Sequence, residues 1–186
     1  MKLYNYFRSS ASFRVRIALQ LKGLPYEYAA VHIAKGEHKL PAYSAVAADN
    51  LVPNLVVDGE HLSQSLAIME YLDETHPTPA LLPKDALGRA RVRALAQSIA
   101  CEIHPLNNLR VLRYLVHDLK LSEDDKNRWY RHWVETGLEA VERILAAQAA
   151  GESVPAGDTA FLDELAERYD TSPDRPRELL RVRQAQ

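Results

Sequence analysis

The sequence predicts an α/β domain followed by an all-helical domain. Strand and helix patterns alternate over residues 1–32, and Asp58-Gly59 stands between two short apolar runs. Beyond Pro83, apolar residues recur only at helical spacing. We therefore expect three parts: an α/β domain over 1–82, an all-helical domain over 88–169, and a loosely ordered tail over 170–186.

The first α/β unit is predicted from residues 1–32. Apolar and aromatic residues favour strands at 2–6 and 26–32, with a helix between them that ends at Gly23. The predicted buried face of this helix is Phe13, Ile17 and Leu21. Arg14 and Arg16 would then point to solvent.

The second half of the α/β domain is predicted from a turn and a helix. Asp-Gly between two apolar runs indicates a hairpin with a two-residue turn at Asp58-Gly59. Residues 65–75 then carry Leu66, Met69 and Leu72 at helical spacing. The stretch 33–50 before the hairpin is polar and rich in alanine, which favours a loop or a short helix.

The rest of the chain predicts helices. Residues 85–117 form one long periodic segment, which Pro105 should bend or divide. Ser122 and the acids after it match a capping box, so a helix should run from there to about residue 149. A break over 151–157 and one more helix over 159–169 would follow.

Composition sets limits on the function. The chain of 186 residues is 47% hydrophobic, and its net charge of −2 gives no general attraction to nucleic acid or an anionic membrane. No run is long enough to span a membrane, and no signal stretch opens the chain. One cysteine, Cys101, allows no internal disulfide, and we expect a cytoplasmic protein.

Six motifs in order along the chain point to a family: RSSASFRVRIAL, LKGLPYEY, NLVPNL, QSLAIMEYLDE, PTPALLP and HPLNNLRVLRYL. Over residues 1 to about 145 the chain resembles the zeta class of glutathione transferases. The resemblance implies a thioredoxin-like domain followed by an all-α domain, glutathione as the cofactor, and a homodimer. It also implies cis-trans isomerisation of maleylacetoacetate or maleylpyruvate in the catabolism of tyrosine, phenylalanine or other aromatic compounds; the residues do not choose between these two substrates.

The loop before the first helix carries the expected chemistry. Glutathione brings a thiol that is only slightly ionised at neutral pH, and a donating hydroxyl or a nearby helix N-terminus favours its thiolate. The resemblance implies that Ser9 stabilises this thiolate, with Ser10 beside it. Taken alone, the serines could only cap a helix, with Ser12 as a candidate cap.

Two further segments are expected to hold glutathione. In thioredoxin-like proteins the proline that corresponds to Pro53 is cis. A cis bond here would leave the backbone of Val52 free to pair with the cysteinyl unit of glutathione. The resemblance also assigns Gln64 and Ser65 to the γ-glutamyl end, with Ser65 as a helix N-cap. An ordinary trans proline and a plain N-cap are the open alternatives.

Arginines should orient the second substrate, a cis-enedione that carries carboxylates. Arginine binds carboxylate bidentately and can stabilise an enolate. The resemblance places Arg8 and Arg110 near this substrate, with His104 and Asn108 as further glutathione-binding candidates. The alternative is that the arginines are solvated and that His104 only hydrogen-bonds at a kink.

Three departures from the family limit the resemblance. Ala11 stands where many zeta enzymes have cysteine, so the reactive sulfur must arrive with glutathione. Asp49 replaces a neutral amide, which we expect to weaken a contact to a glutathione carboxylate. Near residue 150 the resemblance is lost, and we expect a truncation or frame shift that exposes apolar surface; a monodisperse chain that unfolds sharply would contradict it.

Two other functions stay open beside the isomerase. One is a transferase that conjugates glutathione to small electrophiles such as α-haloacids, and the other is a non-catalytic glutathione-binding relative with a damaged helical domain. The remaining notable residues have structural interpretations. Trp129 and Trp133 should pack helices, Cys101 should be a small buried hydrophobe, and the seven histidines show no metal-ligand spacing, so we expect no metal.

Overall fold

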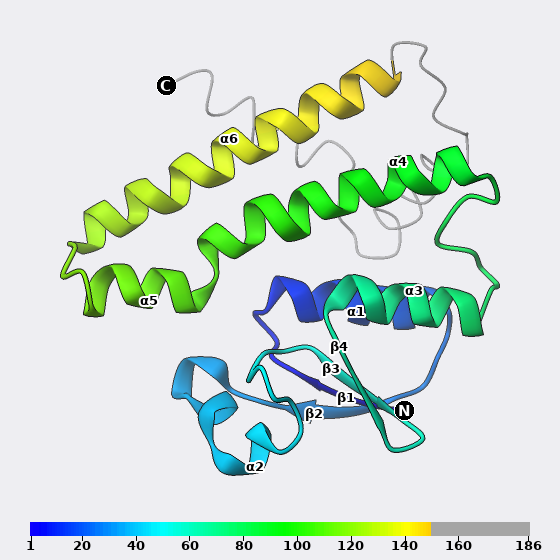
Figure 1. The fold of residues 1–186 in the computed structure, drawn as a ribbon, viewed down its shortest axis with the longest axis horizontal. Coiled ribbons are helices and arrows are strands. Elements are labelled where there is room, and N and C mark those ends of the chain that lie inside the picture. Colours follow the sequence, from blue (N-terminus) through cyan, green and yellow to red (C-terminus); the bar gives the residue numbers. More distant parts are fainter. Residues whose placement is uncertain (150–186) are drawn as a thin grey trace.

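The computed structural model describes residues 1–149. The expected break at 151–157, helix at 159–169, tail after 170 and loss of the last helices all lie outside the described residues. The α/β part consists of β1 (Lys2–Asn5), α1 (Ser10–Leu21), β2 (Glu27–Ala30), two 3-10 turns (Ile33–Lys35 and Glu37–Lys39), α2 (Pro41–Ser44), β3 (Asn54–Val57), β4 (Glu60–Ser63) and α3 (Ser65–Thr75) (Figure 1).

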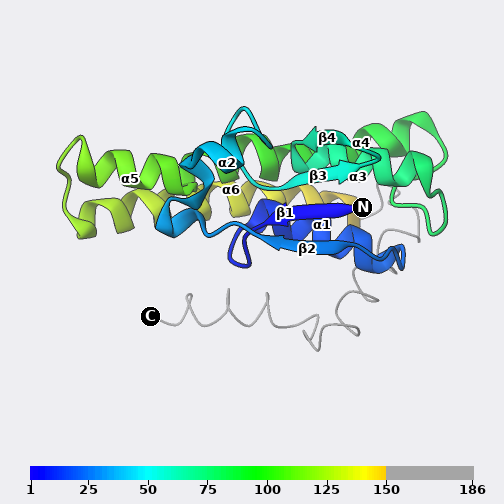
Figure 2. The ribbon, with the colours of Figure 1, turned by 90° about the horizontal axis from the view of Figure 1, so that it is seen from below.

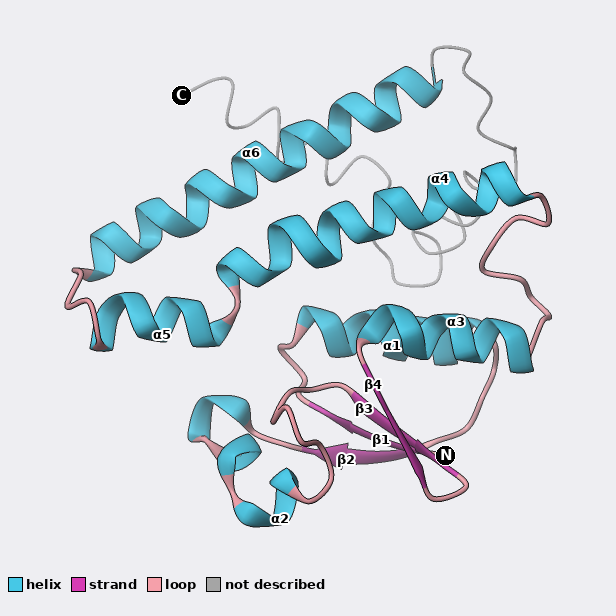
Figure 3. Cartoon of the chain, viewed as in Figure 1, coloured by secondary structure: helices cyan, strands magenta, loops and turns pink. Residues whose placement is uncertain are grey.

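After α3, all elements of the described residues are helical, as expected (Figure 3). They form α4 (Ala86–Gln97), a π-helical segment (Ser98–Ile103), a 3-10 turn (His104–Asn107), α5 (Leu109–His117) and α6 (Glu123–Ala149). The predicted division at Pro105 is confirmed, since the 3-10 turn that contains it separates α4 from α5. The capping box is confirmed as well: Ser122 Oγ accepts from the Asp125 N–H (3.1 Å), and the Asp125 carboxylate accepts from the Ser122 N–H (3.3 Å).

The four strands form one mixed sheet in the order β2-β1-β3-β4 (Figure 2). Strand β1 is parallel to β2 and antiparallel to β3, while β3 and β4 form the predicted hairpin around Asp58-Gly59. In this register Tyr4 pairs with Asn54, and Asn54 pairs with Ser63. The loop after β1, the loop before β3 and the loop after β4 therefore meet at one edge of the sheet.

Helices α1 and α3 lie side by side on one face of the sheet, with α4 above them and α6 farther out (Figure 1). The main core lies between the sheet and these two helices. Its fully buried members are Leu3, Val15, Ala18, Leu19, Leu55, Ile68 and Leu72. A second, smaller cluster joins Val31, Tyr43 and Ala47 beside the sheet.

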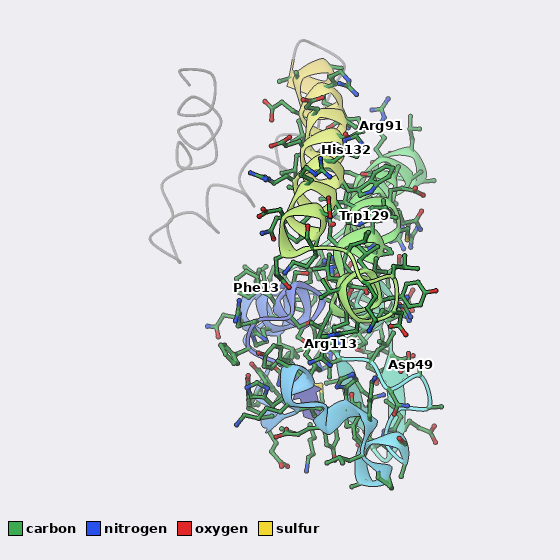
Figure 4. The ribbon with its side chains drawn as sticks, turned by 90° about the vertical axis from the view of Figure 1, so that its left-hand side faces the viewer. Phe13, Asp49, Arg91, Arg113, Trp129 and His132 are labelled. Carbon is green, nitrogen blue, oxygen red and sulfur yellow. The ribbon has the colours of Figure 1, made fainter. Side chains whose placement is uncertain are left out.

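The predicted buried face of α1 was wrong at Phe13, whereas Leu21 is buried and Ile17 half-buried as predicted. Phe13 is 48% exposed and lies on the outer side of the helix (Figure 4), whereas Val15, Ala18 and Leu19 are buried against the sheet. Helix α1 carries two apolar stripes, because it is enclosed by the sheet on one side and by α4 on the other. Ile17, on the second stripe, lines a cavity of ≈ 190 Å³ between α1, α3 and α4.

A buried lysine ties the α/β domain to the segment that leads to α4. The amine of Lys22, whose side chain is 0% exposed, donates to Asp73 Oδ1 (2.8 Å), to the His76 carbonyl (2.6 Å) and to the Pro79 carbonyl (2.7 Å). Asp73 Oδ1 also accepts from the Leu81 N–H (2.7 Å). The connection into the helical domain is thus fixed by one cation.

Helix α6 approaches the π-helical segment closely at Gly137. A Cβ at this position would lie 2.4 Å from Ile103 Cγ1 and 2.7 Å from its Cδ1. Within residues 1–149, no helix is long and apolar enough to cross a membrane.

Gly137→Ala should destabilise the fold although alanine is the better helix former. The methyl group cannot fit beside the β-branched Ile103 unless α6 or the π-helical segment shifts, and such overpacking costs about 1–3 kcal/mol, against a helix-propensity gain of about 1 kcal/mol. Thermal unfolding of the variant checks this. Gly137→Ala together with Ile103→Ala should recover part of the loss, and an unchanged or raised midpoint in the single variant would contradict the close contact.

Candidate functional site

Ser9 ends the loop after β1 and caps α1. It has extended backbone angles (φ −78°, ψ 117°), and its Oγ accepts from the Ser12 N–H at 3.2 Å. The candidate assignment of Ser12 as the cap was therefore wrong; Ser12 is buried, and its Oγ has no hydrogen-bond partner among the described residues. Because Ser9 Oγ uses a lone pair for capping, its own O–H remains available to donate.

Arg16 holds the loop that precedes Ser9. Its guanidinium donates to Asn5 Oδ1 (2.9 Å), to the Tyr6 carbonyl (3.3 Å) and to the Phe7 carbonyl (3.1 Å). The interpretation of Arg16 as a solvated surface residue was wrong. Arg16 adds a second donor to the Tyr6 carbonyl, which already accepts from the Ser9 N–H (3.0 Å), and binds the Phe7 carbonyl as well, so it fixes the path of the chain into α1.

Ser10 and His104 meet across the boundary between the two parts of the chain. Ser10 Oγ lies 2.9 Å from His104 Nδ1, although the residues are 94 positions apart. Burial lowers the pKa of His104, and the nearby cations of Arg14 and Arg110 lower it further. The imidazole is therefore neutral at neutral pH, and one nitrogen faces the start of α1.

The His104 ring should titrate below the ordinary histidine value of about 6.5. Because the pKa is depressed in the folded state, this group contributes stability above pH ~6.5 that is lost as the pH falls through the folded-state pKa. Proton NMR of the ring, assigned with His104→Gln, measures the midpoint. A midpoint above 6.5 would contradict the buried, cation-flanked environment.

The Val52-Pro53 peptide bond is cis, as the resemblance implied. The segment before it is held by Tyr43, which is buried and donates its hydroxyl to the Leu51 carbonyl (2.6 Å). Asp49 is exposed, and its Oδ1 accepts from the Leu51 N–H (3.0 Å), so this carboxylate supports the local turn. Sequence reasoning missed Tyr43, because a tyrosine in an alanine-rich loop gives no sign of its distant partner.

Gln64 and Ser65 stand at the start of α3, on the sheet edge that also bears Pro53. Gln64 is the N-cap residue with φ 66° and ψ 114°, and its side chain makes no capping hydrogen bond. Ser65 is the first helical residue, so its assignment as N-cap was wrong by one position. Its hydroxyl is buried and accepts a hydrogen bond from Arg14 Nη1 (2.9 Å).

Arg14 was the largest omission among the candidate site residues. The helix pattern predicts a solvated side chain, whereas Arg14 is half-buried between α1 and the N-terminus of α3. Burial lowers its pKa, and its cation in turn acts on His104. No periodicity could have found it, since the contact with Ser65 joins residues 51 positions apart.

Within residues 1–149, not every predicted site residue contacts another one. Arg8 and Arg110 are exposed and form no hydrogen bond or ion pair within residues 1–149, although Arg110 is near enough to affect His104. The side chain of Asn108 caps α5, where its Oδ1 accepts from the Val111 N–H (3.2 Å). Arg113, one turn beyond Arg110, donates to the Ala34 carbonyl (2.7 Å) and so joins α5 to the loop after β2 (Figure 4).

Two structural interpretations of helical-domain residues have different outcomes. Trp129 donates to the Leu106 carbonyl (2.8 Å), so the prediction that it packs helices is confirmed, whereas Trp133 packs edge to face with Trp129 on the same helix. Cys101 is exposed, and the prediction of a buried thiol was wrong. It lies in the π-helical segment, where the backbone period differs from 3.6 and shifts side chains away from their expected face.

Comparison with known proteins places the chain in a family. The glutathione S-transferase N-terminal domain model matches residues 1–74. A maleylpyruvate isomerase from Ralstonia sp is 49% identical over 162 residues, which cover 87% of this chain and 76% of that protein. A solved maleylpyruvate isomerase, described as a bacterial glutathione S-transferase in zeta class, is 44% identical with a TM-score of 0.80, over 97% of this chain and 89% of the other. The chain belongs to the zeta class of glutathione transferases.

The zeta-class assignment confirms the expected architecture, a thioredoxin-like domain followed by helices. A second solved zeta-type relative is the maleylacetoacetate isomerase from Anaeromyxobacter dehalogenans 2CP-1, with bound dicarboxyethyl glutathione and citrate in its active site. It is 41% identical, with a TM-score of 0.66, over 78% of this chain and 67% of that one. In this zeta-class chain, Ser9, Pro53 and Ser65 lie at one edge of the sheet. All three fall within residues 1–74, which the family model matches.

Proposed function

We propose that this chain is a glutathione-dependent cis-trans isomerase of a maleyl keto acid, maleylacetoacetate or maleylpyruvate. The observation that carries the proposal is the meeting of a free hydroxyl donor, a helix N-terminus and a cis-proline at one edge of the sheet. The relatives at 49% and 44% identity are maleylpyruvate isomerases. Their reaction fits the degradation of aromatic compounds, and we propose a cytoplasmic homodimer.

Ser9 is proposed to activate the sulfur of glutathione. Its O–H can donate to the sulfur while its oxygen caps α1, and the N-terminal end of this 12-residue helix adds positive partial charge. Ser10, held at His104, stands beside it. Val52 is proposed to pair with the cysteinyl backbone through the cis bond to Pro53, and Gln64 and Ser65 are proposed to hold the γ-glutamyl end.

The isomerisation follows from reversible addition of the thiolate. The sulfur adds to one carbon of the double bond, and the electron pair moves to the neighbouring carbonyl as an enolate. Rotation about the new single bond is then easy, and collapse of the enolate expels the thiolate and restores the double bond in the trans form. One relative binds dicarboxyethyl glutathione, a glutathione that carries a dicarboxylate group. This compound resembles the proposed adduct between the glutathione sulfur and the substrate.

Cations are proposed to hold the substrate dianion. Arg8 precedes Ser9 directly, and Arg110 acts on the His104 that faces Ser10, so both guanidinium groups belong to elements that border the sulfur position. Each is exposed and has no ion-pair partner within residues 1–149, which leaves it available for a carboxylate. His104 and Asn108 remain proposed glutathione contacts. The Asn108 Oδ1 caps α5, so its side-chain N–H groups are the donors proposed to contact glutathione.

One assay tests the proposal against the two alternatives. The absorbance of maleylacetoacetate or maleylpyruvate is followed with glutathione far below the substrate concentration. Turnover that exceeds the added glutathione many times supports an isomerase. Stoichiometric loss of glutathione with an α-haloacid and no isomerisation would indicate a conjugating transferase, and glutathione binding without either reaction would indicate a non-catalytic relative.

A further inference from the structure

We infer that Arg14 is a positioning residue for glutathione: it fixes the Ser65 hydroxyl as a hydrogen-bond donor aimed at the α-carboxylate of the γ-glutamyl unit. The inference rests on the proposed function, because it concerns the same glutathione site. Arg14 does not follow from the sequence motifs, which left it on the solvent side of α1.

The contact with Arg14 fixes the direction of the hydrogen bond at the Ser65 hydroxyl. Arginine has five N–H donors and no acceptor, so in the 2.9 Å contact Arg14 must donate and Ser65 Oγ must accept. Ser65 Oγ is thereby used as an acceptor, and the hydroxyl hydrogen is free to point elsewhere. Ser65 is itself 6% exposed, so the orientation of this hydroxyl is set by the protein rather than by bulk water.

The surroundings of Ser65 favour a negative group. Ser65 is the first helical residue of α3, an 11-residue helix whose early backbone N–H groups lack partners within the helix. Gln64 precedes it in a positive-φ conformation and gives no side-chain cap to these groups. The backbone donors and the Ser65 O–H that Arg14 orients therefore lie at the same helix end, and a carboxylate satisfies them together.

The charge of Arg14 is not neutralised within the described part of the chain. Among residues 1–149 it forms no ion pair, and burial lowers its pKa because the guanidinium is partly removed from water. The two acids nearest along α3 have other partners: Glu70 binds Arg93 through two hydrogen bonds (2.9 and 2.8 Å), and Asp73 binds Lys22. With no acid paired to it among residues 1–149, the guanidinium keeps Nη1 committed to Ser65 Oγ.

The inferred role differs from plain charge attraction. If Arg14 acts through Ser65, its removal should matter only while the Ser65 hydroxyl and the ligand carboxylate are both present. Lysine at this position keeps the charge but presents a point donor on a flexible stem, so it should restore only part of the effect.

The experiment is a calorimetric titration of the purified full chain with glutathione and with an analogue in which the γ-glutamyl α-carboxylate is replaced by hydrogen. We expect Arg14→Met to raise the Kd for glutathione by about 10- to 100-fold and to leave the Kd for the analogue nearly unchanged. Ser65→Ala should give a similar loss, and the double variant should be little worse than either single one. Arg14→Lys should fall between the wild type and Arg14→Met.

A matched control removes the same charge elsewhere. Arg128 lies on α6 with a 75% exposed side chain, and Arg128→Met should bind glutathione like the wild type. The inference is overturned if Arg14→Met binds glutathione with unchanged Kd, if it weakens the analogue equally, or if its effect adds fully to that of Ser65→Ala. Since the titration requires no turnover, absence of isomerase activity would refute the proposed function without deciding the role of Arg14.

Discussion

Ser9→Ala should reduce turnover of the maleyl keto acid by about 100- to 1,000-fold, the loss seen when one donor to a developing anion is removed. Ser9 Oγ accepts from the Ser12 N–H, so its own hydroxyl hydrogen is free to donate to the sulfur, whereas the neighbouring Ser10 Oγ is paired with His104. Loss of the hydroxyl also removes the α1 cap, at about 1 kcal/mol of stability. Steady-state kinetics with saturating glutathione measure the first effect, and thermal unfolding measures the second.

Two further variants separate these effects. Ser9→Asp keeps a capping oxygen for the Ser12 N–H, so stability should be retained, while its negative charge and missing donor disfavour a thiolate. Ser9→Thr keeps both functions and should retain most of the activity. If Ser9→Asp turns over substrate like the wild type, Ser9 serves only as a cap.

Lys22→Met should cause the largest loss of stability of any single change considered, about 3–5 kcal/mol. The lysine amine is fully buried, and its removal leaves the Asp73 carboxylate and the carbonyls of His76 and Pro79 without their shared donor. The same groups hold the segment that leads to α4, so the helical domain should dock less firmly on α1 and α3. Chemical denaturation measures the loss of stability.

An exposed ion pair provides the matched control for Lys22. Lys2 pairs with Glu27 at 2.9 Å, with side chains 37% and 65% exposed, and Lys2→Met should leave the denaturation midpoint almost unchanged. Lys22→Met combined with Asp73→Asn should lose less than the sum of the two single variants, because neither buried charge is then left alone. If Lys22→Met is as mild as Lys2→Met, the lysine does not anchor the linker.

Local chemistry explains why several elements could be predicted. The Asp58-Gly59 turn requires positive φ at both residues, which these residue types tolerate, and the structure has φ 51° and 87° there. Helix α3 spans Ser65–Thr75 as predicted, and Ser122 opens α6 through a reciprocal cap. In each case the signal and the structure lie within a few residues.

Long-range packing explains what could not be predicted. Helix α1 offers two apolar stripes, and only the position of the sheet decides that Val15 rather than Phe13 is buried. Arg14 contacts Ser65, and Arg16 contacts the end of β1 and the loop after it, which no pattern along the helix reveals. The resemblance named Ser9, Ser10 and His104, but it could not show that Ser9 is the cap or that Ser10 and His104 touch.

The proposed isomerisation depends most on acidification of the glutathione sulfur at the start of α1. The direct measurement is the pH titration of thiolate absorbance for glutathione bound to the full chain, compared with bound glutathione in Ser9→Ala. We predict that the bound thiol titrates well below the free thiol value of about 8.5 and that Ser9→Ala shifts it back toward that value. A bound thiol that titrates like free glutathione, or one that Ser9→Ala leaves unchanged, would contradict acidification of the sulfur by Ser9 at the start of α1.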